Sequence, residues 1–232
     1  MALTPNEILT RAADILQDAG NVRWTQAELL RYLNDARREL AIHRPDVYST
    51  TYVMTLAAGS KQSIPADGNK FIDVVRNINA NNTPGRAVRI IEREIIDAQN
   101  PDWHTMTVSN NTRHFMFDER APKTFYVYPA AANGHKLEVV YSKSPTDVVS
   151  GDLSSTSALA AEDIYVGTLL DYILYRSFSK DAEYAGNLQR ADLHYRAFAT
   201  SLGISNRKRI SNSPNVANLD GVPPKAANLE VA

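Results

Sequence analysis

The most constraining feature of the sequence is the stretch 162–203, where apolar residues recur at the three-and-four spacing of one helical face. The spacing predicts two long helices, or one helix bent near Ser179, with a wide apolar face that other parts of the chain must cover. The face contains Ile164, Val166, Leu169, Leu170, Ile173, Leu174 and Phe178, and after the bend Ala185, Leu188, Ala191, Tyr195, Phe198 and Leu202. We expect this stretch to be the framework of a helical bundle.

Four charged residues lie close to the apolar face: Asp171, Arg176, Asp181 and Arg190. No histidine, cysteine or glycine-rich phosphate loop accompanies them in a catalytic spacing. Structural ion pairs are also far commoner than catalytic charges. We therefore interpret these residues as structural ion pairs, either four residues apart on one helix or between helices.

Two helix starts can be read in residues 1–47. Thr4 and Glu7 have the spacing of a capping box with Pro5 at the first helical position, and Thr25 and Glu28 repeat it. Trp24 stands where it can pack on Leu29 as a hydrophobic staple. Gly20 is expected to end the first helix and Pro45 the second. The segment therefore predicts an antiparallel helix pair.

Residues 48–161 are expected to form a β-rich insertion between the helices. TTYVMTL and QSIP are predicted to pair as a hairpin. FIDVVRNINA is compatible with a strand or a helix, and its position between two turn sequences favours the strand. A strand over 86–91 leads into a short helix, EREIIDAQN, before Pro101. HFMFDE, TFYVYP and KLEVVYSK predict an antiparallel meander. Residues 145–161 are interpreted as a serine-rich surface connection back to the long helices.

Composition limits the classes of function. The net charge is -1, so the chain as a whole does not attract nucleic acid or an anionic membrane. The chain has no cysteine, which removes disulfides and thiolate chemistry and fits a reducing cytoplasm. We find no signal-peptide pattern and no apolar run of membrane-spanning length, and we expect a soluble protein without a membrane partner.

Residues 204–232 lose the helical periodicity and are expected to form an extended C-terminal arm. Their aliphatic residues are singly spaced, which suits an extended path along a partner better than a core. A dispensable flexible tail is the alternative. The predicted contacts of the arm are Arg207, Lys208, Arg209, Ile210, Val216, Leu219 and Leu229.

No catalytic, metal or cofactor site is predicted. The five histidines, at 43, 104, 114, 135 and 194, lack the spacing of metal ligands. The sequence Pro-Asp-Trp-His at 101–104 is interpreted as a loop anchored by a buried Trp103. The exposed charges Arg37, Arg38, Glu183 and Arg190 are expected on a helix face that contacts neighbouring subunits.

Residues 165–191, YVGTLLDYILYRSFSKDAEYAGNLQRA, resemble the head-to-tail adaptor family of tailed double-stranded DNA phages. The N-terminal segments RAADILQD, RWTQAELLRYLNDARREL and RPD share the resemblance, as do GRAVRIIEREIIDAQNPDWH and FDERAPKTFYVYP in the middle. It extends through Gly203. The arm after Gly203 has no counterpart in the family pattern.

The resemblance implies an α+β fold and a structural role in the virion. Such a protein would form a ring, commonly of twelve copies, at the head-tail junction. The ring would bind the portal above and a tail or nozzle protein below, and leave a channel for genomic double-stranded DNA without reading its sequence. It would be assembled in the host cytoplasm. The resemblance implies no enzymatic activity.

Three alternatives stay open. Another phage neck or tail-completion ring protein would share the same features. A nucleic-acid-binding module would need a basic face, and its retention on DNA or heparin would fall steeply with salt. An enzyme would need a convergent pocket, and a bound ligand would raise its thermal stability.

Overall fold

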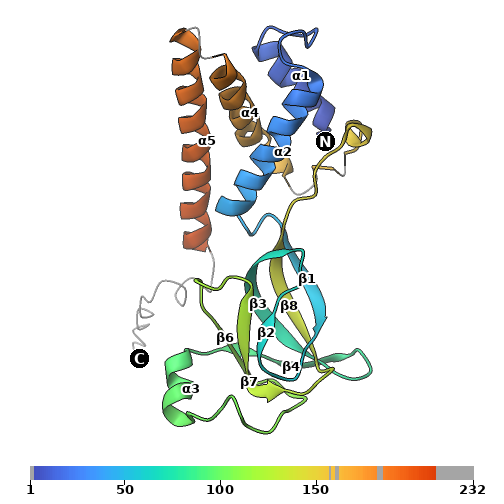
Figure 1. Cartoon of the computed structure of the whole chain (residues 1–232), viewed down its shortest axis with the longest axis vertical. Coiled ribbons are helices and arrows are strands. Elements are labelled where there is room, and N and C mark those ends of the chain that lie inside the picture. The colour runs from blue at the N-terminus through green and yellow to red at the C-terminus, as the bar shows by residue number, and fades with distance from the viewer. Residues whose placement is uncertain (1–2, 157, 160–161, 182–184, 213–232) are drawn as a thin grey trace, which may run out of the picture. The chain divides into compact units, whose positions relative to one another are not determined.

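The computed structural model describes residues 3–156, 158–159, 162–181 and 185–212 (Figure 1). The described residues form two compact units. The helical unit draws on residues 1–37 and 148–232, and the β unit on residues 38–147. Helices precede and follow a strand-rich segment, so the predicted α+β class is confirmed.

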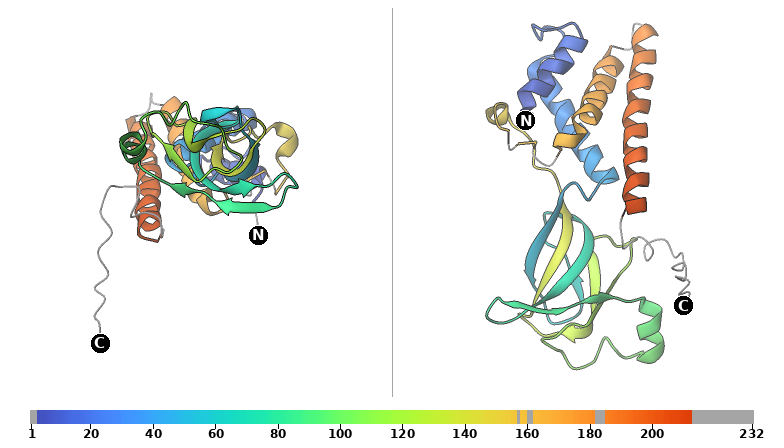
Figure 2. Two further views of the ribbon diagram at one scale, coloured as in Figure 1. Left: turned by 90° about the horizontal axis from the view of Figure 1, so that it is seen from below. Right: turned by 180° about the vertical axis from the view of Figure 1, so that it is seen from behind.

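The helical unit contains α1 (Pro5–Ile15), most of α2 (Gln26–His43), α4 (Val166–Lys180) and α5 (Ala185–Asn212). Two short 3-10 turns, Ser150–Asp152 and Asp163–Tyr165, come before α4. Within this unit α4 lies between α5 on one side and α1 and α2 on the other (Figures 1 and 2). The helix α5 is therefore one edge of the helical layer. No helix in the described part of the chain is long and apolar enough to cross a membrane.

The N-terminal capping box forms as predicted. The Glu7 amide donates to Thr4 Oγ1 at 3.2 Å, and the Thr4 amide donates to Glu7 Oε2 at 2.7 Å. The predicted end at Gly20 is wrong, because α1 stops at Ile15 and Gln17 already adopts a positive φ of 56°. In the second box the Glu28 amide donates to Thr25 Oγ1 at 3.3 Å. The Glu28 carboxylate binds Tyr32 and Lys180.

The helices α4 and α5 pack through aromatic rings. Tyr172 meets Phe198 with ring centroids 5.1 Å apart, and Tyr175 meets Tyr195 at the same separation. The predicted face is confirmed for Val166, Leu169, Ile173, Leu174, Phe178, Ala191, Phe198 and Leu202, which are buried. It is wrong for Ile164, Leu188 and Tyr195, which are exposed. The helical period shows which residues share a face but not how wide the buried part of that face is. On α5 the buried part is narrow, because α4 is its neighbour.

The end of α5 differs from the sequence expectation. The helix continues through Gly203 to Asn212, so the predicted change to an extended arm at 204 comes too early. Arginine and lysine are good helix formers, and a single glycine costs a helix only about 1 kcal/mol, which does not force it to stop. Residues 213–232 of the predicted arm lie outside the described residues.

The return from the β unit to α4 is anchored inside the helical unit. The Asn34 amide nitrogen donates to the Val148 carbonyl at 3.0 Å, and the Val148 amide donates back to Asn34 Oδ1 at 2.9 Å. Val148 and Leu159 are buried. The segment 145–161 is therefore not purely a surface connection.

The β unit holds eight strands and the short helix α3 (Arg93–Gln99). The strands are β1 (Ser49–Thr55), β2 (Gly59–Ser63), β3 (Gly68–Ile78), β4 (Pro84–Ala87), β5 (Arg89–Ile90), β6 (His114–Phe117), β7 (Thr124–Ala131) and β8 (Lys136–Lys143). They form two sheets, ordered β1-β8-β3-β4 and β2-β7-β6-β5. All pairs are antiparallel except β5 with β6.

The pairing of the strands is less local than their order in the chain suggests. The predicted hairpin of β1 with β2 is wrong, because β1 pairs with β8 and β2 pairs with β7. The strands β6 and β7 pair as neighbours, while β8 joins β3 in the other sheet. The single strand expected over 86–91 is divided at Val88, where the chain passes from one sheet to the other.

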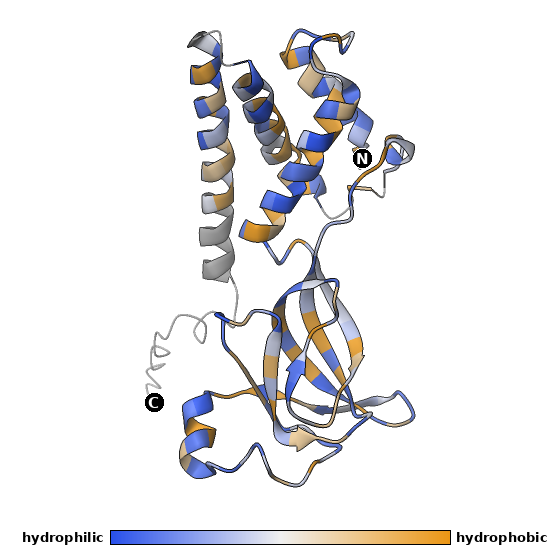
Figure 3. Cartoon of the chain, viewed as in Figure 1, coloured by the Kyte–Doolittle hydropathy of each residue, from blue (hydrophilic) through white to orange (hydrophobic). Residues whose placement is uncertain are grey.

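The two sheets enclose an apolar core, and apolar residues recur along β1, β3 and β8 (Figure 3). Phe71 from β3 stacks on Phe125 from β7 with centroids 4.5 Å apart. Gly68 allows close packing, because an added Cβ would lie 2.6 Å from Ile64 Cδ1 and 2.8 Å from Tyr141 Cδ2.

A buried polar hub ties the segments of the β unit together. Asn77 Nδ2 donates to the carbonyls of Arg86 and Thr112, both at 2.8 Å, while its Oδ1 accepts from the Thr112 amide at 2.8 Å. His135 Nε2 lies 2.9 Å from the same Oδ1 and serves as a donor. Burial lowers the pKa of His135 below its ordinary value, so the neutral ring is favoured.

Candidate interaction surfaces

Arg37 does not lie on an exposed helix face. It is buried, and its Nε donates to Glu162 Oε1 at 2.7 Å, where Glu162 is buried as well. The prediction that Arg37 is exposed on a helix face is therefore wrong. A charge pattern on one helix could not reveal a partner lying more than a hundred residues away in the sequence.

The other three charges predicted for that face are not brought together. Arg38 forms a bidentate pair with Asp147 inside the β unit, at 2.7 and 2.6 Å. Glu183 lies outside the described residues. Arg190 is exposed on α5, and its guanidinium lies 5.6 Å from the centroid of the Phe178 ring. Of the three that the structure describes, Arg190 is the exposed charge on the helical unit.

The arm residues divide between two regions of the chain. The backbone of Arg207, Lys208, Arg209 and Ile210 belongs to the last turns of α5. Val216, Leu219 and Leu229 lie outside the described residues. The three consecutive cations therefore stand on a helix instead of at the root of an extended segment.

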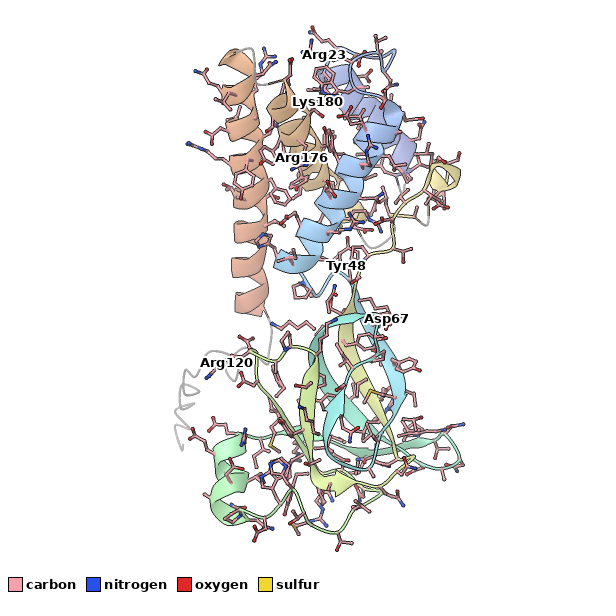
Figure 4. All side chains as sticks on the ribbon, in the orientation of Figure 1. Arg23, Tyr48, Asp67, Arg120, Arg176 and Lys180 are labelled. Atoms are coloured by element: carbon pink, nitrogen blue, oxygen red, sulfur yellow. The ribbon has the colours of Figure 1, made fainter. Side chains whose placement is uncertain are left out.

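A polar cluster joins α2 to α4. Lys180 Nζ lies 2.7 Å from Glu28 Oε2, and the Tyr32 hydroxyl donates to Glu28 Oε1 at 2.8 Å. Burial and the Glu28 carboxylate raise the pKa of Tyr32 to about 12, and the Lys180 ammonium holds the pKa of Glu28 below its ordinary value. The Arg176 guanidinium lies 5.6 Å from the centroid of the Tyr32 ring. Figure 4 labels Arg176 and Lys180 in the helical unit. Within the described residues, Arg176 therefore lies over an aromatic ring instead of in the ion pair expected for it, and the same is true of Arg190 over Phe178.

The remaining predicted contacts of the long helices are also structural. Asp171 accepts a hydrogen bond from His194 Nδ1 at 2.9 Å, with His194 stacked on Phe178. Asp181 pairs with Arg23 and accepts from Asn187 Nδ2 at 2.7 Å. Both carboxylates therefore fasten α4 to its neighbours.

The loop 101–104 has the structural role predicted for it. Trp103 is fully buried, and its indole nitrogen donates to Asp97 Oδ1 at 2.8 Å. His104 Nδ1 lies 2.8 Å from Ser60 Oγ.

Among the described residues, no three histidine, cysteine, aspartate or glutamate side chains gather as metal ligands would.

The outer surface of α5 carries exposed apolar side chains. Leu193 is 65% exposed, Leu188 is 60% exposed and Tyr195 is 48% exposed. Five residues at about 100° each place Leu193 about 140° from Leu188 around the helix. Leu193 therefore stands on a different face from the other two, away from α4.

A small pocket lies beside α1 and the loop that follows it. Its floor is formed by the buried Leu9 and Ala13 of α1. Its rim is formed by Thr10, Asp14, Ala19, Asn21 and Gln26. The volume is about 70 Å³. Ligand pockets usually measure about 300 to 1,000 Å³, so this one has room for a side chain and not for a cofactor.

The loop that walls this pocket is firmly held. The Asp18 carboxylate accepts the backbone N–H groups of Val22, Arg23 and Trp24, each at 2.9 Å. The Trp24 N–H contributes most to holding the pKa of Asp18 below its ordinary value. The Trp24 indole donates in turn to the Ser177 carbonyl at 3.2 Å. The pocket is therefore preformed.

Leu193 and the α1 pocket were not predicted from the sequence. A signal for Leu193 exists, because it is a leucine that falls outside the three-and-four spacing of α5. The pocket has no such signal. It depends on where α1 ends and how the 16–25 loop turns back, and neither is visible as a pattern of residue types.

The sequence model of a protein family, described as SU10 adaptor protein, matches residues 4–218 of the chain. No curated protein matches the sequence of this chain. Since the match covers most of the chain, the chain belongs to the SU10 adaptor protein family, a family of phage head-tail adaptors.

Proposed function

We propose that this member of the SU10 adaptor family links the capsid of a tailed phage to its tail as a ring at the head-tail junction. The single observation that supports this role is the family match over residues 4–218. The ring docks beneath the portal, receives a tail or nozzle protein below, and leaves a channel for double-stranded DNA. The role is structural and not enzymatic.

The charge distribution suits a protein that DNA passes without being recognised. The net charge of the whole chain is -1, which gives no general attraction to DNA. Affinity for the phosphate backbone depends on many basic contacts, so contact with DNA in the channel would be weak.

The C-terminal residues 204–232 provide the contact with the portal or a neighbouring subunit in this proposal. Arg207, Lys208 and Arg209 present three charges from the end of α5 to an acidic surface. Val216, Leu219 and Leu229 then fill separate small pockets along the partner. Exposed charges of the helices, Arg190 foremost, pair between subunits.

Attachment to particles tests this function. Phage particles that lack the protein are mixed with the purified chain and sedimented, and copies per particle are counted. We expect several copies at one vertex and recovery of tail binding. Absence of attachment, or attachment along the capsid surface, would refute the adaptor role.

The arm is tested by a chain that ends at Asn212, because it keeps the whole of α5. We expect this variant to keep its helical dichroism and melting temperature but to dissociate from the particles. A second variant with Arg207, Lys208 and Arg209 changed to alanine separates the charges from the rest of the arm. Normal attachment by both would remove the arm from the proposal.

A further inference from the structure

The exposed Leu193 is surrounded by features that suit a contact between protein surfaces. Arg190 lies three residues before it and Arg196 three residues after it, which places all three on one face of α5. Arg196 pairs with Asp192 at 2.8 Å. Arg190 contacts an aromatic ring and, in the described part of the chain, no carboxylate within ion-pair distance. The face therefore presents one apolar side chain and one available cation.

The α1 pocket has the complementary chemistry. Its floor of Leu9 and Ala13 is apolar, and Asp14 at its rim is exposed. Within the described residues, no ion pair or hydrogen bond involves the Asp14 side chain. The pocket thus combines an apolar depression of side-chain size with a carboxylate beside it.

These two surfaces lie on opposite edges of the same helical layer, with α5 at one edge and α1 on the far side of α4 (Figures 1 and 2). One copy cannot bring its own Leu193 to its own pocket without dismantling the layer. A second copy can, and every copy has both surfaces. Contacts of this head-to-tail kind produce a closed ring when the rotation between copies closes.

We propose that Leu193 of one copy inserts into the α1 pocket of the next, with Arg190 beside Asp14 of that copy. This contact rests on the proposed ring and identifies the side chains that join its subunits. It buries a leucine that is 65% exposed in the single chain. It also pairs two charges, Arg190 and Asp14, for which the described residues provide no ion-pair partner. A contact of this size is weak by itself and acts through repetition around the ring.

The absence of cysteine from the chain permits a direct test. Leu193→Cys and Thr10→Cys are combined in the full-length chain, which is oxidised both in concentrated solution and on particles. Because a disulfide needs its two Cα atoms within about 7 Å, it reports a specific contact. We expect dimers, trimers and longer disulfide-linked ladders. The matched control combines Leu188→Cys with Thr10→Cys, because Leu188 is similarly exposed but lies on another face of α5.

A several-fold excess of ladders for position 193 over position 188 supports the contact. Equal ladders, or none, overturn it, even if the protein attaches to particles in many copies. Failure of the unmodified chain to attach refutes the adaptor function separately, since crosslinking in solution does not depend on attachment. The two proposals therefore fail by different measurements.

Charge reversal tests the polar half of the contact. In the 193/10 cysteine pair, Arg190→Glu should reduce ladder formation several-fold, and Asp14→Lys in the same chain should restore it. Arg176→Glu is the matched control, because Arg176 is also an exposed arginine over an aromatic ring but lies on α4. Loss without restoration, or an equal loss for Arg176→Glu, would remove the Arg190–Asp14 pair from the proposal.

Discussion

The two units of this protein bury their apolar residues in different ways. The β unit closes two sheets around one core and ties its strands to a buried asparagine, Asn77. The helical unit is a layer in which the edge helix α5 keeps leucines exposed on two faces. The β unit therefore encloses its core between two sheets, while the helical unit leaves two faces of its edge helix uncovered.

The comparison can be measured because each unit contains one of the two tryptophans. Trp24 belongs to the helical unit and Trp103 to the β unit, and both are buried. Fluorescence of Trp24→Phe reports the β unit, and fluorescence of Trp103→Phe reports the helical unit. Each variant serves as the reference for further changes.

The largest effect is expected in the core of the β unit. Phe71→Ala removes a ring that stacks on Phe125, and we expect a loss of about 3 to 5 kcal/mol in the free energy of unfolding. Denaturant unfolding followed by Trp103 measures it. If the loss is smaller when unfolding is followed by Trp24 fluorescence than by Trp103 fluorescence, the two units unfold separately. Equal losses would show that the chain unfolds as one cooperative unit.

A core truncation in the helical unit comes next. Leu174 is buried on α4, and Leu174→Ala should lower the free energy of unfolding by about 2 to 5 kcal/mol. Denaturant unfolding followed by the fluorescence of Trp24 measures this loss. Leu170 was predicted on the same face but is only partly buried, so Leu170→Ala should cost less. Equal losses for the two variants would contradict the packing described for α4.

Several elements could be predicted from the sequence because they depend on neighbouring residues. The Thr4–Glu7 capping box, the strand over 68–78 and the buried Trp103 are of this kind. Their determinants lie within a few positions of one another, where spacing and residue type are directly readable.

Other elements depend on residues far apart in the sequence and were missed. The pairing of β1 with β8 joins residues about ninety positions apart, and turn chemistry could not indicate it. The burial of Arg37 depends on Glu162. The α1 pocket depends on the path of a loop. Candidate contact residues were least predictable, since the exposure of Leu193 requires knowing which helices surround α5.

The β unit should respond to acid through His135. Its folded pKa is lowered by burial, so the unfolded state binds more protons between that value and about 6.5. The stabilisation from the neutral ring is complete above about 6.5 and is lost as the pH falls toward the folded pKa. The loss is measured from unfolding midpoints, followed by the fluorescence of Trp103, in buffers from about pH 7.5 to about pH 5.5. This range extends about one unit on either side of the ordinary histidine pKa of about 6.5.

His135→Gln is the control for this pH dependence. Glutamine keeps a donor for Asn77 Oδ1 but does not titrate. The variant should lose the part of the acid sensitivity that belongs to His135. The same slope in both proteins would assign the sensitivity to other groups.

The smallest effect is expected at Leu193. Its side chain is 65% exposed, and alanine is at least as good a helix former, so Leu193→Ala should change the free energy of unfolding by no more than about 0.5 kcal/mol. Leu174→Ala, also a leucine truncation in the helical unit, should cost several times more. Followed by Trp24, these two variants separate residues that build the unit from residues that it leaves for partners. A loss at Leu193 as large as that at Leu174 would mean that its side chain supports the fold of the single chain. The outer face of α5 would then be part of the core, and the contrast between an enclosed β core and an uncovered edge helix would not hold.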